Sequence, residues 1–555
     1  MKGAQMFRDR ATTINSLAVA AIFLASLAIR ASFPITAYGD AIHDDRLFVE
    51  MSSTLGNFHW LGNYSEFTLA KGAAYSFFLL LNRITGLPLK VTEHFAYLCV
   101  ALFFALTVAN LLRSRAGGTI CFAVLAMNPV VWNASMGGRV VREGFYMTLA
   151  LLLIALALRA YVLRRAPVLH DDYLAKKRTL VAFGLAGGVF WLTREEGLWI
   201  VPSIAVVVGT WILRTWLESP GRQTLRAGVP FLAVPLLAFG AVVGTIDTIN
   251  YFVYGVFRNN DFRSGDFQGA YGALSRIRHD NWQRFVVFPS DARERAYSVS
   301  AAARELKPFF EGEGALGWRR ISCEQTGRSE CPEVLSGWFM WALRGAVTQT
   351  GHYRSAPESQ AFYRRLAAEI DAACDSGQIP CGPARETMIP PWQPSYASDT
   401  ATASWSIFST LVHLKGADPA IFASTGDPGN INFFRRVTHG PIATETDLDP
   451  KGIRRQAAKA IAKLQQQITP FAVLLALIAW AALLVTRLRE SWLHPGNVIA
   501  LALATAVATR VVLLGLLDAT SIPSNNLLYV SPAVPMLLAF APCVAAWLLG
   551  RRSRD

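Results

Sequence analysis

Long apolar runs separated by short polar segments cover the first half of the chain and its C-terminal end. Runs of roughly 17 to 25 apolar residues are long enough to cross a bilayer as helices. The pattern therefore predicts a polytopic α-helical membrane protein with about ten transmembrane helices. The predicted spans are Ala11–Tyr38, Thr92–Leu112, Gly118–Ala134, Val141–Leu163, Thr179–Thr193, Gly197–Leu213, Val229–Ile249, Pro470–Val485, Asn497–Leu517 and Leu528–Leu549.

The first polar loop, residues 38–91, differs from the short turns between the other spans. It mixes acidic residues with apolar side chains such as Phe48 and Met51, which predicts amphipathic helices. Its apolar run AAYSFFLLL is too short to cross the bilayer. We interpret Gly72–Lys90 as a helix that lies along the outer membrane surface.

Residues 250–469 contain no run that could cross the membrane, and they are rich in charged residues, Gly, Ser and Pro. At about 220 residues this segment is large enough to fold as a domain. Near its end, Ile453–Gln467 has helix-period apolar positions and a basic face, which predicts a surface helix leading into the next span. The chain thus divides into an N-terminal membrane module (1–249), an extracytoplasmic insert domain (250–469) and C-terminal transmembrane helices (470–555).

The basic residues gather in short segments beside the apolar runs. A hydrophobic content of 52% and a mean hydropathy of +0.31 are too high for a soluble enzyme. The net charge of +14 therefore follows the positive-inside rule, and no basic patch with interleaved aromatic residues indicates nucleic acid. The rule places both termini in the cytoplasm and residues 38–91 and 250–469 outside. The orienting residues are Lys2, Arg8, Arg10, Arg113, Arg115, Arg164, Arg165, Lys176, Lys177, Arg178, Arg214, Arg222, Arg226, Arg487, Arg489, Arg551, Arg552 and Arg554.

The seven cysteines fall into two groups. Three lie within apolar runs and are expected to be unreactive core thiols. The other four form two close pairs in the polar insert, which predicts two local disulfides in an oxidising compartment. A zinc site is the alternative, although the spacing is wider than the usual ligand pattern. The pairs are Cys323 with Cys331 and Cys374 with Cys381, and the apolar-run cysteines are Cys99, Cys121 and Cys543.

Four loops on the predicted outer face carry more polar side chains than short turns need. Adjacent acids at a membrane edge are costly to desolvate, so the pair Asp44–Asp45 is the centre of our functional hypothesis. The four groups are His43, Asp44, Asp45, Glu50 and Lys71; Asn133, Arg139, Arg142 and Glu143; Arg194, Glu195 and Glu196; and Asp518, Ser524, Asn525 and Asn526.

Each of these groups also has a purely structural interpretation. Asp44 and Asp45 could cap a helix or stay solvated, and Lys71 could extend to lipid headgroups. His43 is expected to be a hydrogen-bonding neighbour of the acids rather than a metal ligand. His352 and the Trp residues of the insert are too scattered to assign.

The basic residues of the second and third loops leave the same choice open. Arg139 and Arg142 could extend to headgroups, but their i, i+3 spacing also places both guanidinium groups on one helix face, which suits a phosphate. The run Arg194, Glu195, Glu196 could be a local ion-pair network. No GxGxxG, Walker loop or HExxH motif supports soluble-type nucleotide or zinc-protease chemistry.

Several motifs appear in an order that resembles one family. Asp44–Asp45 is followed by Phe48 and Glu50, and then by Lys71–Gly72 at the start of the second amphipathic helix. In this order the chain resembles the GT-C superfamily of integral membrane glycosyltransferases, most closely the branch with protein O-mannosyltransferases and the lipid A aminoarabinose transferase. The resemblance extends to Arg139–Glu143, to TREEGLWIVP (193–202) and to LLYVSPAVPMLL (527–538).

The chain departs from the family pattern at two places. Gly72 stands where the family usually has Pro after the Lys, and Asn525 and Asn526 stand where it often has an Arg before the aromatic residue of the last span. The resemblance covers the membrane part, and residues 250–469 match nothing in it.

The resemblance implies transfer of a sugar, a hexose or a pentose, from a polyprenyl-phosphate donor to a hydroxyl group of a glycan, lipid or protein. Such a reaction needs a carboxylate base, cations for the leaving phosphate and a half-apolar cavity for the lipid. Asp44 is the first candidate base and Asp45 the second. Lys71, Arg139, Arg142 and Arg194 are the candidate phosphate ligands, and His43, Glu50, Glu143, Glu195 and Glu196 are supporting residues.

These assignments carry expectations about cofactors and location. Some relatives need a divalent cation such as Mg²⁺ or Mn²⁺; the cationic candidates here favour metal independence, and no residue is assigned to a metal. The protein is expected in a bacterial inner membrane, contacting its lipids, with the site and the insert on the periplasmic side. Alternatives are a transporter or flippase of lipid-linked glycans and a membrane-anchored envelope assembly protein.

Overall fold

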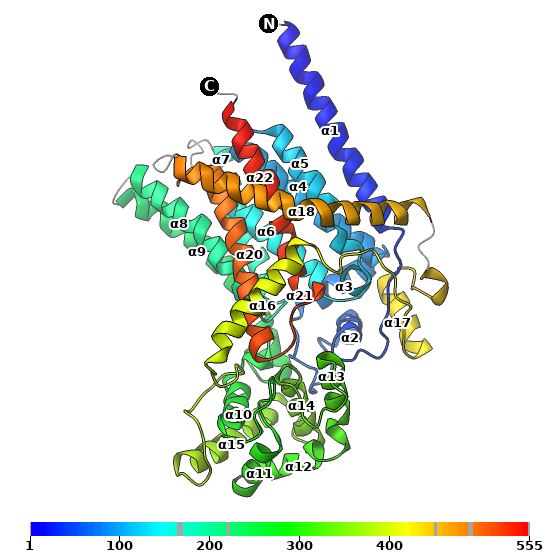
Figure 1. Ribbon diagram of the computed structural model, residues 1–555, viewed down its shortest axis with the longest axis vertical. Coiled ribbons are helices and arrows are strands. Elements are labelled where there is room, and N and C mark those ends of the chain that lie inside the picture. Colours follow the sequence, from blue (N-terminus) through cyan, green and yellow to red (C-terminus); the bar gives the residue numbers. More distant parts are fainter. Residues whose placement is uncertain (1, 164–169, 219–221, 449–451, 487–491, 553–555) are drawn as a thin grey trace.

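The computed structural model describes residues 2–163, 170–218, 222–448, 452–486 and 492–552. Within these ranges the regular secondary structure is helical, and the only strand-like pairings are isolated bridges. Figure 1 shows a helical bundle at one end of an elongated molecule and a smaller helical domain at the other. Both chain ends project from the same end of the bundle, as expected when they lie on one side of a membrane.

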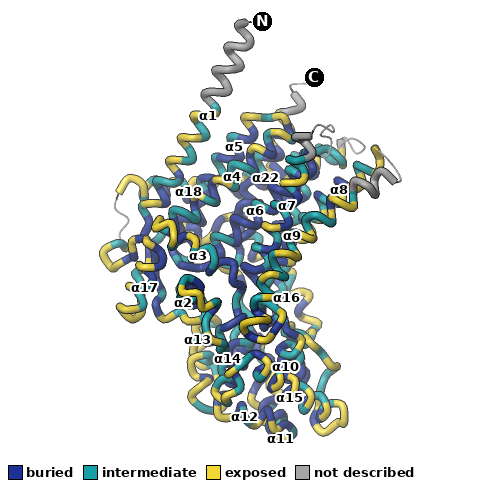
Figure 2. The backbone as a smooth tube through the Cα atoms, turned by 180° about the vertical axis from the view of Figure 1, so that it is seen from behind, coloured by how far each residue is buried: buried dark blue, intermediate teal, exposed yellow. Residues whose placement is uncertain are grey.

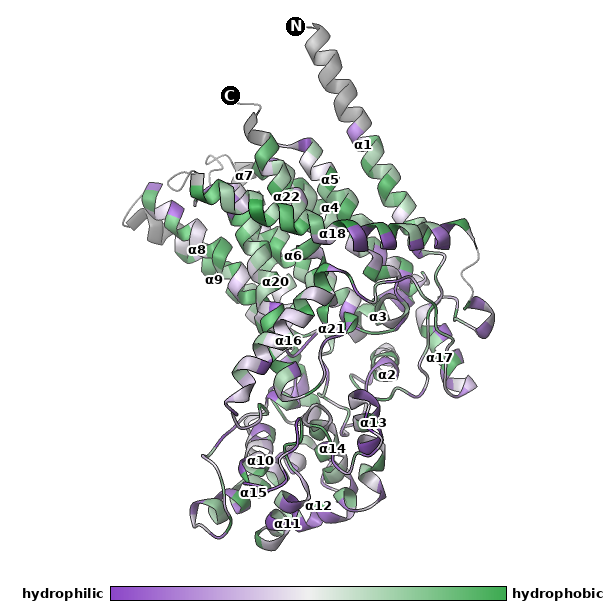
Figure 3. Cartoon of the chain, viewed as in Figure 1, coloured by the Kyte–Doolittle hydropathy of each residue, from purple (hydrophilic) through white to green (hydrophobic). Residues whose placement is uncertain are grey.

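Seven helices of the described residues are long and apolar enough to cross a membrane. Figure 3 shows that apolar residues dominate the bundle, whereas the domain at the opposite end is mixed and polar. The protein is therefore a multi-pass membrane protein. These seven segments are Leu89–Leu112 (α4), Glu143–Val162 (α6), Gly197–Glu218 (turn η4, Gly197–Ile200, with α8, Val201–Glu218), Gly228–Tyr254 (within α9, Arg222–Tyr254), Ile453–Val485 (within α18, Ile453–Thr486), Pro495–Thr520 (α20), and Leu527–Leu549 (α21, Leu527–Val530, turn η8, Ser531–Ala533, and α22, Val534–Arg552).

The other three predicted spans correspond to helices that are not among these seven. Helix α1 (Lys2–Arg30) has 29 residues, and its side chains are described from Asn15 to Arg30. Helix α5 (Arg115–Ala126) has 12 residues, and α7 (His170–Trp191) has 22. At 1.5 Å per residue, 12 residues cover about 18 Å, less than the hydrocarbon core of about 30 Å. The total of ten spans stays a prediction.

Two predicted spans end earlier than expected, and the reason is local. Helix α1 stops at Arg30 rather than at Tyr38, because Pro34 cannot continue a helix and residues 31–38 form bridges to distant segments. Helix α5 stops at Ala126, because Asn128 bonds the N–H of Val130 and Pro129 opens a 3₁₀ turn. That turn (η1, Pro129–Trp132) lies in the rest of the predicted span. A π turn (η2, Ala134–Gly138) begins at the last residue of that span.

The first outer loop contains two amphipathic helices, as predicted. Helix α2 (Asp45–Gly56) buries Leu47, Phe48 and Met51 on one face, and α3 (Ala74–Thr85) packs against it. Leu81 and Ile84, which lie near the end of α3, are exposed. Such an exposed apolar edge suits a helix that touches the outer leaflet.

The polar insert begins with a helical domain that has its own core. Its helices are α10 (Gly265–Arg276), α11 (Ser290–Val299), α12 (Ala301–Phe310), α13 (Leu316–Thr326), α14 (Ser336–Gln349) and α15 (Ala356–Asp375), with 3₁₀ turns η5 (Asp261–Arg263) and η6 (Glu313–Ala315). Cys323 bonds Cys331 and Cys374 bonds Cys381, so both predicted disulfides are present, with Cα atoms 5.3 and 5.5 Å apart. The free cysteines Cys121 and Cys543 are buried, but Cys99 is exposed on α4 and is not a core thiol.

After α15 the chain returns to the membrane bundle. Helix α16 (Ser395–Val412) packs along α20, and α17 (Pro428–Thr438) packs on α2 and α3. A Cβ on Gly515 of α20 would overlap Ser404 of α16, so only glycine allows this approach. The 3₁₀ turn η7 (Glu445–Asp447) follows. Figure 2 shows that buried residues gather inside the bundle, whereas α16 and α17 carry many exposed positions.

Helix α18 joins two elements that the sequence pattern separates. The predicted basic surface helix Ile453–Gln467 and the predicted span Pro470–Val485 form one continuous helix of 34 residues. Pro470 lies inside it without ending it. Of the orienting basic residues, Arg164, Arg165, Arg487, Arg489 and Arg554 lie outside the described residues. For Lys2, Arg8, Arg10, Arg222, Arg226, Arg551 and Arg552, only the backbone is described.

Candidate active site

The two adjacent aspartates make separate ion pairs at the start of helix α2. Asp44 pairs with Lys71, and 43% of its side chain is open to solvent. Asp45 is fully buried, and its carboxylate accepts two hydrogen bonds from Arg139, at 3.2 Å from Nε and 2.5 Å from Nη2. The neighbouring acids therefore have different environments, which the sequence alone could not distinguish.

The local structure explains why these residues meet. Asp44 directly precedes α2, yet its side chain makes no capping hydrogen bond, so the helix-cap interpretation is wrong. Arg139 follows the π turn η2 in extended conformation, and π turns are frequent at functional sites. Lys71 precedes Gly72, where a Cβ would overlap the carbonyl oxygen of Leu192. Glycine at this position thus lets the loop that carries Lys71 pack against the loop that follows α7.

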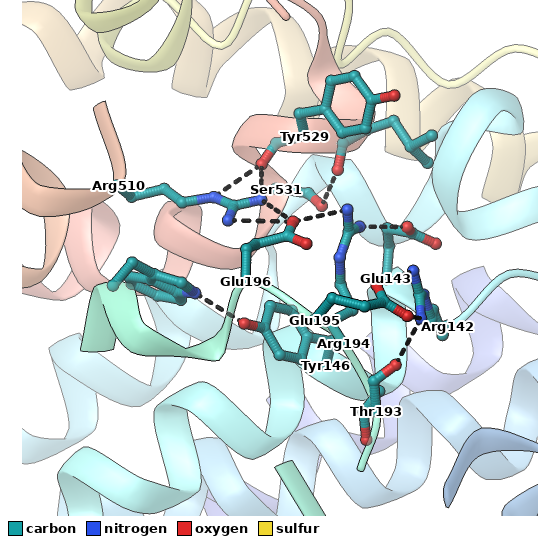
Figure 4. Close-up of polar contacts among 12 residues, drawn as sticks. Arg142, Glu143, Tyr146, Thr193, Arg194, Glu195, Glu196, Arg510, Tyr529 and Ser531 are labelled. Atoms are coloured by element: carbon teal, nitrogen blue, oxygen red, sulfur yellow. Dashed lines mark hydrogen bonds and ion pairs between the residues drawn. The ribbon is translucent and has the colours of Figure 1, made fainter. Parts of the chain in front are cut away.

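A second set of ion pairs lies deeper and links the second and third loops (Figure 4). Arg142 binds both carboxylate oxygens of Glu195, at 2.8 and 2.7 Å, and donates to the carbonyl of Thr193. Arg194 pairs with Glu143 and, at 2.6 Å, with Glu196. At most a quarter of any of these five side chains is exposed to solvent.

Arg510 of α20 completes this network, and the sequence analysis did not include it. It pairs with Glu196 at 3.3 Å, donates to the carbonyl of Tyr529 at 2.7 Å, and is fully buried. A buried Arg in an apolar run is itself a signal of function or pairing. Figure 4 shows the Glu196 carboxylate between Arg510 and Arg194, with Tyr529 above them.

Burial and neighbouring charges shift the pKa values of these carboxylates in different directions. Burial raises the pKa of Asp44, but Lys71, Arg139 and Arg142 outweigh it and lower the pKa to about 2. Burial likewise opposes Arg194 and Arg510 at Glu196, whose pKa falls to about 2. At Asp45 burial is the stronger effect and raises the pKa, although Arg139 opposes it. Asp45 is thus the acid of the pair that protonates more easily.

The supporting residues of the first loop have different surroundings. The His43 ring lies between Phe67, Trp318 and Trp341, with ring centroids 4.8 to 5.2 Å away. Burial and the charge of Lys71 lower its pKa to about 4, so the ring is neutral at pH 7. Glu50 pairs with Arg46 on the same helix at 2.6 Å.

The fourth loop contributes differently from the prediction. The Asp518 carboxylate accepts hydrogen bonds from the backbone N–H groups of Ser524 and Asn525. The side chain of Asn526 caps α21. Asn133 donates to the carbonyls of Gly416 and Asp418 in the returning segment. These side chains shape turns, because Asp, Ser and Asn readily bond nearby backbone groups.

Arg263, which belongs to the insert, also supports the site. It donates to the carbonyls of Arg194 and Glu195 and stacks on Trp191, 3.9 Å from the ring centroid. No local sequence pattern marks it, because its partners are backbone groups of a distant loop. The insert therefore holds the third loop of the site in place.

No family model and no curated protein sequence matches the chain. Among solved structures it is similar to ArnT from Cupriavidus metallidurans, in the apo state (14% identity, 98% of this chain, 78% of that chain, TM-score 0.33) and bound to undecaprenyl phosphate (14%, 91%, 77%, 0.32). It is also similar to the Archaeoglobus fulgidus oligosaccharyltransferase tethered with an acceptor peptide. That match has 12% identity and a TM-score of 0.26, and it covers 78% of this chain and 64% of that chain.

Proposed function

We propose that the protein is a glycosyltransferase that moves a sugar from a polyprenyl-phosphate donor to an acceptor hydroxyl on the extracytoplasmic side. One observation carries the proposal: a solvent-open, ionised Asp44 lies beside Lys71 and next to the buried pair Asp45–Arg139. A base beside cations is what transfer from a lipid phosphate requires. The motif order of the sequence, which resembles GT-C enzymes, supports the same reaction.

In the proposed reaction Asp44 takes the proton of the acceptor hydroxyl as its oxygen attacks the anomeric carbon. The bond from that carbon to the phosphate oxygen breaks, and polyprenyl phosphate leaves with the electron pair. Lys71 and Arg139 stabilise the growing phosphate charge, and the proton on Asp44 passes to solvent. With the pKa of Asp44 lowered to about 2, the carboxylate is ready to act as base at neutral pH.

The four candidate phosphate ligands divide into two pairs. Lys71 and Arg139 keep 12% and 20% of their side chains open to solvent, so a phosphate can reach them. Arg142 and Arg194 are almost completely buried among glutamates, and we assign them to holding the loops in place. Arg194 has one further feature: its Nε has no hydrogen-bond partner among the described residues.

The donor set does not fit a divalent cation. Among the described residues no group of three or more His, Cys, Asp and Glu side chains could hold a metal ion. The carboxylates of Asp44 and Asp45 are each bonded to a cationic side chain instead. The proposed reaction therefore has no step that uses Mg²⁺ or Mn²⁺.

The location and partners follow from the orientation predicted by the basic segments. The site would lie on the periplasmic side of a bacterial inner membrane, where its lipids supply the polyprenyl-phosphate donor. The acceptor would be a glycan, lipid or protein of the cell envelope. The sugar would be a hexose or a pentose.

The test uses purified protein in lipid nanodiscs with a radiolabelled polyprenyl-phosphate sugar and cell-envelope acceptor fractions. Asp44→Asn is expected to lower kcat by about 10²- to 10⁴-fold, the usual contribution of a general base. Asp40→Asn, an exposed acid of the same loop, is the matched control. Near-normal transfer by both Asp44→Asn and Asp45→Asn would refute the assignment.

A further inference from the structure

A buried cavity lies directly beneath the turn that carries Arg139, between α1, α4 and α6. Arg30, Lys90, Glu93 and His94 line its polar side, and Met136 and Met147 line its apolar side. The cavity offers about 20 Å³ to the centres of water molecules. A buried water needs about 10 to 15 Å³ by this measure, so the cavity has room for one.

His94 lines this cavity and has one ring nitrogen without a hydrogen-bond partner among the described residues. The hydroxyl of Ser26 donates its hydrogen to the carbonyl of Ala126, at 2.6 Å. The contact of 2.8 Å between Ser26 Oγ and His94 Nε2 therefore requires that Nε2 carries the hydrogen. In the neutral ring Nδ1 is then a bare acceptor. It is buried and has no partner among the described residues.

The opposite side of the cavity supplies donors. Arg30 has five N–H groups, and its hydrogen bonds within the described residues go to the carbonyls of Phe33 and Gly137. Lys90 donates to Glu93, whose carboxylate also accepts from Tyr75. A ligand between these groups must accept from Arg30 or Lys90 and donate to His94 Nδ1. Water does both, whereas a halide ion cannot donate and a metal cation would be repelled by Arg30 and Lys90.

Arg30 connects the cavity to the candidate active site. Its Nη2 donates to the carbonyl of Gly137, at 2.8 Å, two residues before Arg139. Gly137 lies against the backbone of Val131 so closely that a Cβ would overlap it. A shift of Arg30 therefore moves this turn. Arg139, which follows the turn and binds Asp45, moves with it.

We propose that this cavity binds one water molecule, which joins His94 to the cationic side of the cavity, and that Arg30 and His94 are positioning residues for Arg139. The proposal of a bound water does not depend on the proposed function. The proposal of a positioning role deepens the proposed function and rests on it, because its test measures donor binding and transfer.

Radiolytic hydroxyl labelling of the wild-type protein in nanodiscs tests the hydration. A bound water generates radicals next to Met136 and Met147, although both are buried. We expect their oxidation to exceed several-fold that of Met536, which is equally buried away from the cavity. His94→Phe should remove the excess. Equal protection of all three methionines in the wild type would overturn the water site.

A double-mutant cycle on polyprenyl-phosphate binding and on donor KM tests the positioning. Arg30→Met and Arg139→Lys should each weaken donor binding several-fold, and the double variant should lose less than the product of the two, because one acts through the other. Arg30→Lys, which keeps a donor, should recover part of the loss. Arg214→Met removes a comparable bond to the Leu493 carbonyl at the opposite end of the bundle and serves as control.

The outcomes separate the two ideas. Independent, multiplicative losses in the cycle, with transfer intact in the wild type, would overturn the positioning role and leave the proposed function standing. Absence of transfer and of donor binding in every variant, the wild type included, would refute the proposed function, while the labelling result would still decide the water site.

Discussion

The ion pairs of the site form two regions that differ in one physical respect. In the outer pairs, Lys71–Asp44 and Arg139–Asp45, solvent reaches 12% and 20% of the cationic side chains. In the inner network of Arg142, Glu143, Arg194, Glu195, Glu196 and Arg510, no cationic side chain is more than 7% exposed. Both contain Arg and acidic side chains, so residue type alone does not separate them.

This difference indicates separate tasks. An open pair can exchange its partner for a substrate phosphate at low cost, because solvent already weakens it. A closed pair cannot, because removal of either partner leaves a buried charge. We infer that the outer pairs meet the substrate and the inner network fixes the three loops that carry them. The following predictions order the expected effects from largest to smallest.

The largest effect on stability is expected at the centre of the inner network. Arg194→Ala leaves Glu143 and Glu196 buried without their common partner, which typically costs about 3 to 5 kcal/mol. Thermal unfolding in detergent, followed by circular dichroism, measures it. The double variant Arg194→Met, Glu143→Gln should regain part of the loss, because Glu196 keeps its ion pair with Arg510. An unchanged Tm for Arg194→Ala would contradict the closed network.

A smaller effect, on binding rather than on stability, is expected at the outer pair. Lys71→Gln removes a charged hydrogen bond to the donor phosphate, worth about 1.5 to 3 kcal/mol, or roughly a tenfold to hundredfold rise in donor KM. Its Tm should change little. Lys415→Gln, an exposed lysine of the returning segment, is the control. If Lys71→Gln lowers Tm as much as Arg194→Ala does, the comparison between the two regions fails.

The next effect concerns pH. The pKa of Asp44 is lowered to about 2, so this base stays ionised as the pH falls to 5. The pKa of Asp45 is raised by burial, so Asp45 protonates first and then holds Arg139 less well. We expect an acid limb in kcat/KM with its midpoint above 3.8, the ordinary value for an aspartate. Profiles from about pH 4 to 8 should show that limb in the wild type and not in Asp45→Asn.

The smallest effect is expected at His43. The lowered pKa of about 4 leaves the ring neutral, so it carries no charge that the reaction needs at pH 7. His43→Phe keeps the ring contacts with Phe67, Trp318 and Trp341. Its kcat/KM at pH 7 should stay within about threefold of wild type. A loss as large as that of Asp44→Asn would make His43 a proton carrier.

The sequence predicted much of the architecture because membranes impose simple rules. Apolar length located the helices of the bundle, and cysteine spacing in a polar segment predicted both disulfides. Helix α16 was missed as a bundle helix because its Ser, Thr and Ala residues pack on α20 through small side chains rather than through an apolar run.

The candidate site was predictable as a set of loops but not as a set of pairs. Asp44 and Asp45 look alike in the sequence, and only the fold gives one to Lys71 and the other to Arg139. Arg510 was visible as a charge in an apolar run, yet its partner comes from a loop 314 positions away. Arg263 donates hydrogen bonds to backbone groups of another loop and stacks on Trp191, so no local sequence pattern marks it.

Helix α18 has a mechanical consequence. Its 34 residues measure about 51 Å, well beyond the hydrocarbon thickness, so a single rod links the apolar core to the headgroup layer. Arg455 near its outer end binds the carbonyl of Ser32, in the segment that leads to Asp44. Because bilayer thickness changes helix tilt, this contact couples the tilt of α18 to the segment that leads to Asp44.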